Sequence, residues 1–121
     1  QQVHVYDIAG NEIGLISQRL FTFLPTFDIS VGGRPCGSIR KEFTFFKPSY
    51  SIEYGGWQCD GDFLSWNYSV TAGSRLVANI AKQLLSWGDT YTLDISDPGD
   101  EIMALMLVIA IDAANCSQNN N

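Results

Sequence analysis

The amino-acid sequence predicts a mainly β fold with one helix: an antiparallel β-barrel of repeated hairpins around a buried, hydrophobic C-terminal α-helix. Three observations predict this fold. Short segments with alternating apolar and polar residues recur along the chain, glycine-containing turns separate them, and a long apolar run stands near the C-terminus. Alternation is typical of half-buried strands, and Gly-containing turns of this length join antiparallel strands.

The strands belong to a repeated unit. In each unit a strand ends in a Gly-containing turn, a second strand runs to an aromatic cluster, and a third strand follows a tight corner. When the units are aligned, Ile16, Ile39 and Ile80 coincide. Repetition of this kind indicates sequential units that share one core. The aligned segments are ISQRLFTFLPTFDI (16–29), IRKEFTFFKPSYSI (39–52) and IAKQLLSWGDTYTL (80–93).

The turns and the remaining strands follow from local chemistry. Hairpin turns are predicted at 9–12, 32–35 and 72–75, because glycine adopts positive φ without steric cost. The segments TFDISV, SYSIEY, NYSVT and TYTLDIS alternate apolar with polar residues. The segment GGWQCDGDFLSW is inserted between the second and third units, and its turn residues predict at least one additional strand.

The residues from Asp97 onward predict the helix. Asp97 suits the N-cap position, Pro98 the first helical position, and two acids follow in the first turn. Nearly every residue from 102 to 114 is apolar, which predicts a helix that is buried on all sides. The polar residues 115–121 are expected to form a frayed tail.

Composition limits the function classes. With 121 residues, the chain suits a single domain, residues 1–121. Thirteen acids and seven bases give a net charge of −6, which argues against nucleic-acid binding. The longest apolar run, 102–111, is too short to cross a bilayer, so the chain is expected not to be transmembrane.

Three widely spaced cysteines, Cys36, Cys59 and Cys116, form no C-x-x-C pair. They are interpreted as reduced thiols of a cytoplasmic protein, without a disulfide framework, a metal site or a cofactor. The sequence does not begin with Met, and we expect it to be part of a longer natural chain.

Four motifs occur in order along the chain: FTFFKPSYSI, GDFLSWNYSV, SWGDTYTLDISDPGDE and ALMLVIAID. With these motifs the chain resembles the LOR family, its bacterial YxjI-like members in particular. The resemblance implies the Tubby C-terminal-like fold, a closed antiparallel barrel around a central helix that phospholipid scramblases share. Members of the family usually begin with a further hairpin. We therefore expect this chain to lack that N-terminal hairpin and its barrel to be incomplete there.

The resemblance also suggests a partner. Tubby domains bind phosphoinositides and scramblases act at membranes, so phospholipid or phosphoinositide headgroups are the ligands it implies, with the protein cytoplasmic and peripheral at the membrane. The candidate ligand-binding residues are Arg40, Lys41, Lys47 and Lys82. Lys82 occupies the repeat position of Lys41, and both are expected to point outward. The alternative interpretation is a solvated, edge-protecting surface.

Other candidates have structural interpretations. His4 alternates with valines and is expected to face outward from a strand. Asp60-Gly61-Asp62 fits a turn better than a cation site. The aromatic residues are expected to pack the core, because the helix leaves little room for a ligand. These residues are Phe21, Phe23, Phe43, Phe45, Phe46, Trp57, Phe63, Trp66 and Trp87.

The leading functional hypothesis is a non-catalytic binding or scaffolding domain that acts through surface electrostatics and an inserted aromatic or apolar loop. One alternative is a small hydrolase that uses the carboxylates of Asp60, Asp62 or Asp89. A third hypothesis is a purely structural protein-interaction module.

Overall fold

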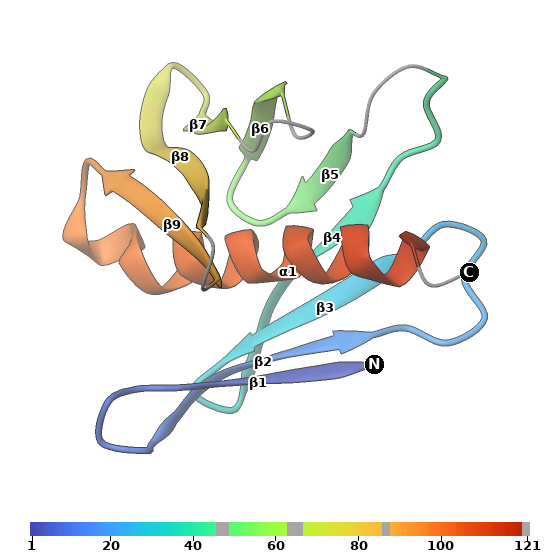
Figure 1. Cartoon of the computed structure of the whole chain (residues 1–121), viewed down its shortest axis with the longest axis horizontal. Helices are drawn as coiled ribbons and strands as arrows, with labels where there is room; N and C mark the ends of the chain where they lie inside the picture. The colour runs from blue at the N-terminus through green and yellow to red at the C-terminus, as the bar shows by residue number, and fades with distance from the viewer. Residues whose placement is uncertain (46–48, 63–66, 86–87, 120–121) are drawn as a thin grey trace.

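The structure is a computed structural model that describes residues 1–45, 49–62, 67–85 and 88–119. In these ranges the chain forms nine strands, a short 3-10 helix and one α-helix (Figure 1). The strands are β1 (Gln2–Tyr6), β2 (Glu12–Gln18), β3 (Thr26–Val31), β4 (Arg34–Lys41), β5 (Tyr50–Glu53), β6 (Trp57–Asp62), β7 (Asn67–Ala72), β8 (Arg75–Leu85) and β9 (Gly88–Ile95). The helices are η1 (Pro98–Asp100) and α1 (Glu101–Asn119).

The strands form two antiparallel sheets, one of β1 to β5 in sequence order and one of β6 to β9. The predicted hairpin turns lie between β1 and β2, β3 and β4, and β7 and β8. The additional strand predicted between the second and third units is β6. Within the described ranges no ladder connects the two sheets, so a closed barrel stays a prediction.

The repeated isoleucines form the centre of the core. Ile16 on β2, Ile39 on β4 and Ile80 on β8 are all fully or almost fully buried. Ile39 pairs with Ile52 of β5, and Ile80 pairs with Leu93 of β9. The alternation recognised in the sequence therefore places equivalent residues of the repeats on the inner face of each sheet.

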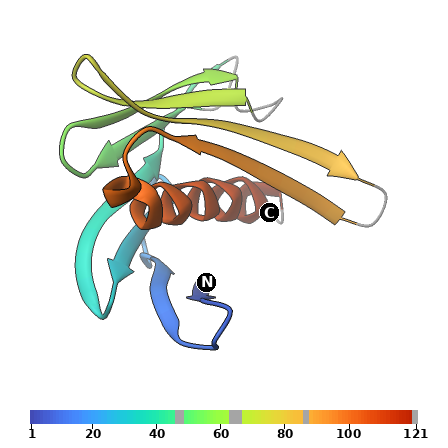
Figure 2. The ribbon, with the colours of Figure 1, turned by 90° about the vertical axis from the view of Figure 1, so that its left-hand side faces the viewer.

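Helix α1 lies between the two sheets and contacts strands of both (Figure 2). The Asp97 carboxylate accepts a hydrogen bond from the Gly99 N–H at 2.9 Å, which is the predicted capping interaction. Strand β2 approaches the helix closely at Gly14, where a Cβ atom would overlap the Met106 side chain. The helix continues through Asn119, so residues 115–119 of the expected frayed tail are helical.

The helix is less completely enclosed than the apolar run predicts. Ala104, Leu107 and Ile111 are fully buried, whereas Ile102 is 44% exposed. Leu105 is only half-buried. One stripe of the helix is thus partly open, while the opposite faces are covered by the two sheets.

We expect Leu107→Ala to lower the free energy of unfolding by about 2 to 5 kcal/mol, because it removes a fully buried side chain and leaves a cavity. Leu105→Ala is the matched control on the partly open stripe, and its cost is expected to be clearly smaller. Urea denaturation followed by circular dichroism measures both. Equal losses would mean that the stripe is covered in solution.

Candidate functional site

An exposed aromatic surface occupies one end of the molecule. The loop 19–25 and the residues after β4 carry apolar side chains that face solvent. Phe21 is 102% exposed, Phe23 is 96% exposed and Phe45 is 85% exposed. The prediction that the aromatic residues pack the core is therefore wrong for Phe21, Phe23, Phe43 and Phe45, whereas Trp57 is buried as predicted. The remaining four residues of that prediction lie outside the described residues: Phe46, Phe63, Trp66 and Trp87. We call this surface the aromatic end, defined as Leu20, Phe21, Phe23, Phe43 and Phe45.

The two loops of the aromatic end are held side by side by the ladder between β3 and β4. The Lys41 N–H donates to the Pro25 carbonyl at 2.9 Å, directly where both loops begin. Phe43 and Phe45 contact each other edge to face, with ring centroids 5.3 Å apart. Both loops project at the end of the molecule where α1 ends (Figure 1). The exposed rings therefore lie on two loops that leave neighbouring strands at the same end of the molecule.

The backbone of the first loop is strained at its most exposed aromatic residue. Phe21 has a φ of 60°, a left-handed conformation that bulky residues rarely adopt. The loop is closed at its base, where the Arg19 N–H donates to the Thr26 carbonyl at 2.9 Å. This conformation holds the Phe21 ring away from the core, and strain of this kind often occurs at functional sites.

The two repeat-related lysines point inward, which corrects the prediction that they face outward. Lys41 is 8% exposed, and its Nζ atom donates to Asn115 Oδ1 of α1 at 3.4 Å. The Lys82 side chain is 10% exposed, and its Nζ atom lies 3.7 Å from Asp112 Oδ1. The two lysines are equivalent in the repeat, and both approach the C-terminal half of the same helix.

Arg40 alone of the described candidate bases has an exposed charge, and that charge is paired. Its guanidinium donates to Glu42 Oε1 through Nε at 3.0 Å and Nη2 at 2.9 Å. Lys47 lies outside the described residues. The structure therefore does not bring the three described bases, Arg40, Lys41 and Lys82, together into one basic patch.

The lysines belong to a polar cluster inside the molecule. The Tyr50 hydroxyl donates to Asn115 Oδ1, the same atom that Lys41 approaches. Lys82 also lies over the ring of Tyr91, with Nζ 5.3 Å from the centroid. Burial lowers the pKa of Lys41 and raises the pKa of Cys59 to about 12. The cluster therefore contains a thiol that is protonated at neutral pH.

Of the three candidate acids, the structure describes the side chain of Asp60 alone. Asp60 is exposed on β6, while the side chains of Asp62 and Asp89 lie outside the description. Asp100 pairs with Arg75 at 2.8 Å, which secures η1 to β8. Within the described residues, no three His, Cys, Asp or Glu side chains gather closely enough to hold a metal ion.

His4 is exposed on β1, as the alternation predicts, and its Nδ1 atom contacts the Glu12 carboxylate across the hairpin. Among the helices of the described residues, none has the length and apolar character needed to span a membrane.

The aromatic end was missed because alternation alone does not distinguish an inner strand from a projecting loop. The available signal was the position of the aromatic residues before a proline, in LFTFLP and FTFFKP. Proline removes a ladder donor and is disfavoured within a central strand. Aromatic residues that precede such a break are therefore placed where the strand has ended.

We expect Cys59→Ala to reduce the loss of stability at alkaline pH. The folded pKa of Cys59 is raised from 9.0 to about 12, so between these values the unfolded chain releases a proton that the folded chain retains. The free energy of unfolding then falls by about 1.4 kcal/mol per pH unit from this group, and the variant lacks that contribution. Urea titrations from pH 8 to 11 measure the slope. Cys36→Ala, at an exposed cysteine of β4, is the control and should keep the wild-type slope.

Comparison with known proteins identifies the family. The family model LOR, described as LURP-one-related, matches residues 1–112. The chain is 33% identical over 106 residues to the uncharacterized protein YxjI of Bacillus subtilis (strain 168). The match covers 88% of this chain and 65% of that relative, so the chain spans slightly less than two thirds of the relative's length. No solved structure matches the chain significantly. Because the family model covers nearly the whole chain, the chain belongs to the LURP-one-related (LOR) family.

Proposed function

We propose that the chain is a non-catalytic binding domain that docks on a phospholipid surface through its aromatic end. The observation that supports this proposal is the exposure of five large apolar side chains in two adjacent loops. Large apolar side chains that are exposed together at one end of a molecule mark sites of contact with membranes or proteins. The lipid surface is preferred because projecting loops with separate rings suit insertion between headgroups better than flat contact.

Insertion of the rings supplies the main driving force. Burial of about 100 Å² of each ring contributes about 2.5 kcal/mol at about 25 cal/mol/Å². Phe21 and Phe23 on one loop and Phe45 on the other are each at least 85% exposed. Three such rings together contribute about 7.5 kcal/mol toward docking, before the cost of association is subtracted.

Electrostatic contacts contribute less to docking than insertion of the rings. Headgroup phosphates are contacted by Arg40 and Lys47, which flank the second aromatic loop in the sequence. Lys41 and Lys82 contact α1 inside the molecule, and these contacts stabilise the end that carries the second aromatic loop. Because the net charge is −6, an anionic surface repels the rest of the molecule. We therefore expect the affinity for vesicles to change more when the exposed rings are removed than when the salt concentration is raised.

We also propose a closed barrel and a peripheral location at a membrane. A barrel closed around α1, as in Tubby-like proteins and phospholipid scramblases, would hold both aromatic loops rigidly at one end. The domain would act peripherally on the cytoplasmic face of a membrane. Phosphoinositides are the headgroups that the basic residues would favour.

The test is co-sedimentation with phosphatidylcholine vesicles, with and without phosphatidylinositol phosphates. We expect the double variant Phe21→Ser/Phe23→Ser to bind at least about 100-fold more weakly than the wild type, because about 2.5 kcal/mol per ring corresponds to more than tenfold each. Arg40→Gln/Lys47→Gln should reduce binding only to the phosphoinositide-containing vesicles.

The matched control is Ile8→Ser, which removes an equally exposed apolar side chain from the β1–β2 turn, outside the aromatic end. Its binding should equal that of the wild type. Wild-type affinity in the double phenylalanine variant, or an equal loss in the Ile8 variant, would refute docking through the aromatic end. Circular dichroism verifies that each variant is folded.

A further inference from the structure

A small polar cavity of about 60 Å³ lies on the five-stranded sheet, close to the bases of the two aromatic loops. Its lining residues come from β3, β4, β5 and the residue that follows β2. The volume corresponds to about two water molecules, so the cavity suits a small polar group. The lining residues are Arg19, Thr26, Ser38, Arg40, Ser51 and Glu53.

The strand ladders place these side chains on one face of the sheet. Thr26 pairs with Arg40, and Arg40 pairs with Ser51. Two residues further along β4, Ser38 pairs with Glu53. Residues that pair directly across an antiparallel ladder share a face, and so do residues two apart on one strand. The cavity is therefore built by cross-strand neighbours whose positions the ladders fix.

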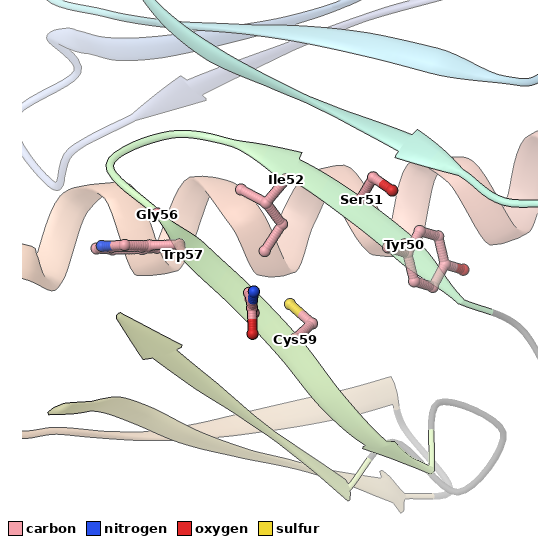
Figure 3. Close-up of a pocket in the computed structure, with 7 residues that line it drawn as sticks. Tyr50, Ser51, Ile52, Gly56, Trp57 and Cys59 are labelled. Atoms are coloured by element: carbon pink, nitrogen blue, oxygen red, sulfur yellow. The ribbon is translucent and has the colours of Figure 1, made fainter. Parts of the chain in front are cut away.

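The face that carries the cavity is the outer one. Tyr50 is buried and contacts Asn115 of α1, and the next residue, Ser51, points to the opposite side of β5. Figure 3 shows Ser51 on β5, with α1 behind the strand. The cavity thus lies on the solvent side of the sheet, away from the helix and the apolar core.

Two guanidinium groups flank the cavity, and both keep donors for a ligand. Arg19 donates to Asp28 through Nε at 3.0 Å and Nη2 at 2.8 Å. Arg40 donates to Glu42 through the same two atoms. A guanidinium carries five N–H donors, so the Nη1 group of each arginine can donate to a ligand. Phosphate oxygens are acceptors that guanidinium groups recognise well.

The other polar groups of the cavity offer acceptors. The Thr26 hydroxyl donates to the Leu24 carbonyl at 2.9 Å, and the Ser51 hydroxyl donates to the Glu42 carboxylate. A hydroxyl whose proton is engaged in this way presents its lone pairs to a ligand. Glu53 is exposed and contributes a carboxylate to the lining. A ligand therefore needs hydrogen-bond donors on this side of the cavity.

The charges at the cavity do not suit a simple anion. Its two arginines stand among three carboxylates, those of Asp28, Glu42 and Glu53. The pKa of Glu42 is lowered, first by the hydrogen bond from Ser51 and then by that from Arg40, so this group stays ionised at neutral pH. An anion without a positive group meets a small excess of negative charge. A zwitterion with a phosphate and an ammonium group matches both kinds of charge.

We propose that this cavity binds the phosphoethanolamine headgroup of a phospholipid. The phosphate accepts hydrogen bonds from Arg19 and Arg40, and the ammonium group donates to Glu53 and to the neighbouring hydroxyl oxygens. A choline headgroup fits less well, because quaternary ammonium groups are recognised by aromatic rings and the described lining residues carry none. This inference rests on the proposed docking, which brings headgroups to the bases of the aromatic loops.

The soluble probes are glycerophosphoethanolamine and glycerophosphocholine, titrated into the whole ¹⁵N-labelled chain. We expect glycerophosphoethanolamine to shift the Nε–H resonances of Arg19 and Arg40 at millimolar concentration. It should bind at least about fivefold more tightly than glycerophosphocholine, because its ammonium group forms hydrogen bonds that a trimethylammonium group cannot form. Equal binding of the two probes, or no shift with either, would overturn the proposal.

The variant Glu53→Gln separates the two halves of the headgroup. It should weaken the binding of glycerophosphoethanolamine by about tenfold, because a charge-assisted hydrogen bond is lost. It should not weaken the binding of inorganic phosphate, because a negative charge is removed. Arg34→Gln and Asp60→Asn, at exposed positions of β4 and β6 outside the cavity, are the matched controls and should bind as the wild type. Wild-type affinity for glycerophosphoethanolamine in Glu53→Gln would refute the proposal.

Vesicles distinguish the lipid from a free headgroup. Phosphatidylethanolamine and phosphatidylcholine are both zwitterionic, so exchange of one for the other leaves the charge of the surface unchanged. We expect phosphatidylethanolamine to tighten co-sedimentation of the wild type by about fivefold. Glu53→Gln should lose this gain and bind pure phosphatidylcholine vesicles as the wild type. A gain that persists in Glu53→Gln would assign the effect to lipid packing and overturn the proposal.

Failure of this inference and failure of docking give different results. If the wild type binds phosphatidylcholine vesicles through its rings but gains nothing from phosphatidylethanolamine, the headgroup assignment is wrong and the docking stands. If the wild type binds neither kind of vesicle, docking is wrong, and the soluble titrations alone decide whether the cavity recognises phosphoethanolamine. Circular dichroism verifies that each variant is folded.

Discussion

The structure depends on one constraint, the burial of an apolar helix between two sheets. Leu107 and Ile111 have no exposed surface, and Met106 occupies the space that Gly14 leaves on β2. Each strand must therefore direct its apolar residues toward α1, which explains why the repeated isoleucines are among the most deeply buried residues of the sheets. Since the helix fills the centre, surfaces for partners are left to the loops and to the outer faces of the sheets.

Much of the fold could be predicted from the sequence. Alternation and glycine turns locate the hairpins, and Asp97 with Pro98 locates the start of the 3-10 helix η1, directly before α1 begins at Glu101. The candidate site was predicted less well, because sequence periodicity does not say which face of a strand is inside. Lys41 stands opposite Tyr50 in the ladder, so both point toward α1. The exposure of Phe21 depends on a left-handed backbone conformation that its residue type does not indicate.

Lys41 and Lys82 place their charged groups beside helix α1 inside the molecule. An ammonium group near the C-terminal half of a helix interacts favourably with the helix dipole. Asp112 and Asn115 lie three residues apart, on one side of α1, and receive one lysine from each sheet. Two of the four basic residues that the sequence assigned to a ligand, Lys41 and Lys82, thus have a structural role. The contact of Lys41 with α1 holds the end of β4, from which the second aromatic loop projects.

The pairing of two equivalent lysines with one helix has a consequence for how the repeats diverge. The sheets repeat a common unit, but the helix is present once and offers each copy a different partner. Lys41 meets an amide, whereas Lys82 meets a carboxylate. Equivalent positions in the two copies therefore experience different selection. A substitution at Lys41 is therefore expected to have a different effect from the same substitution at Lys82.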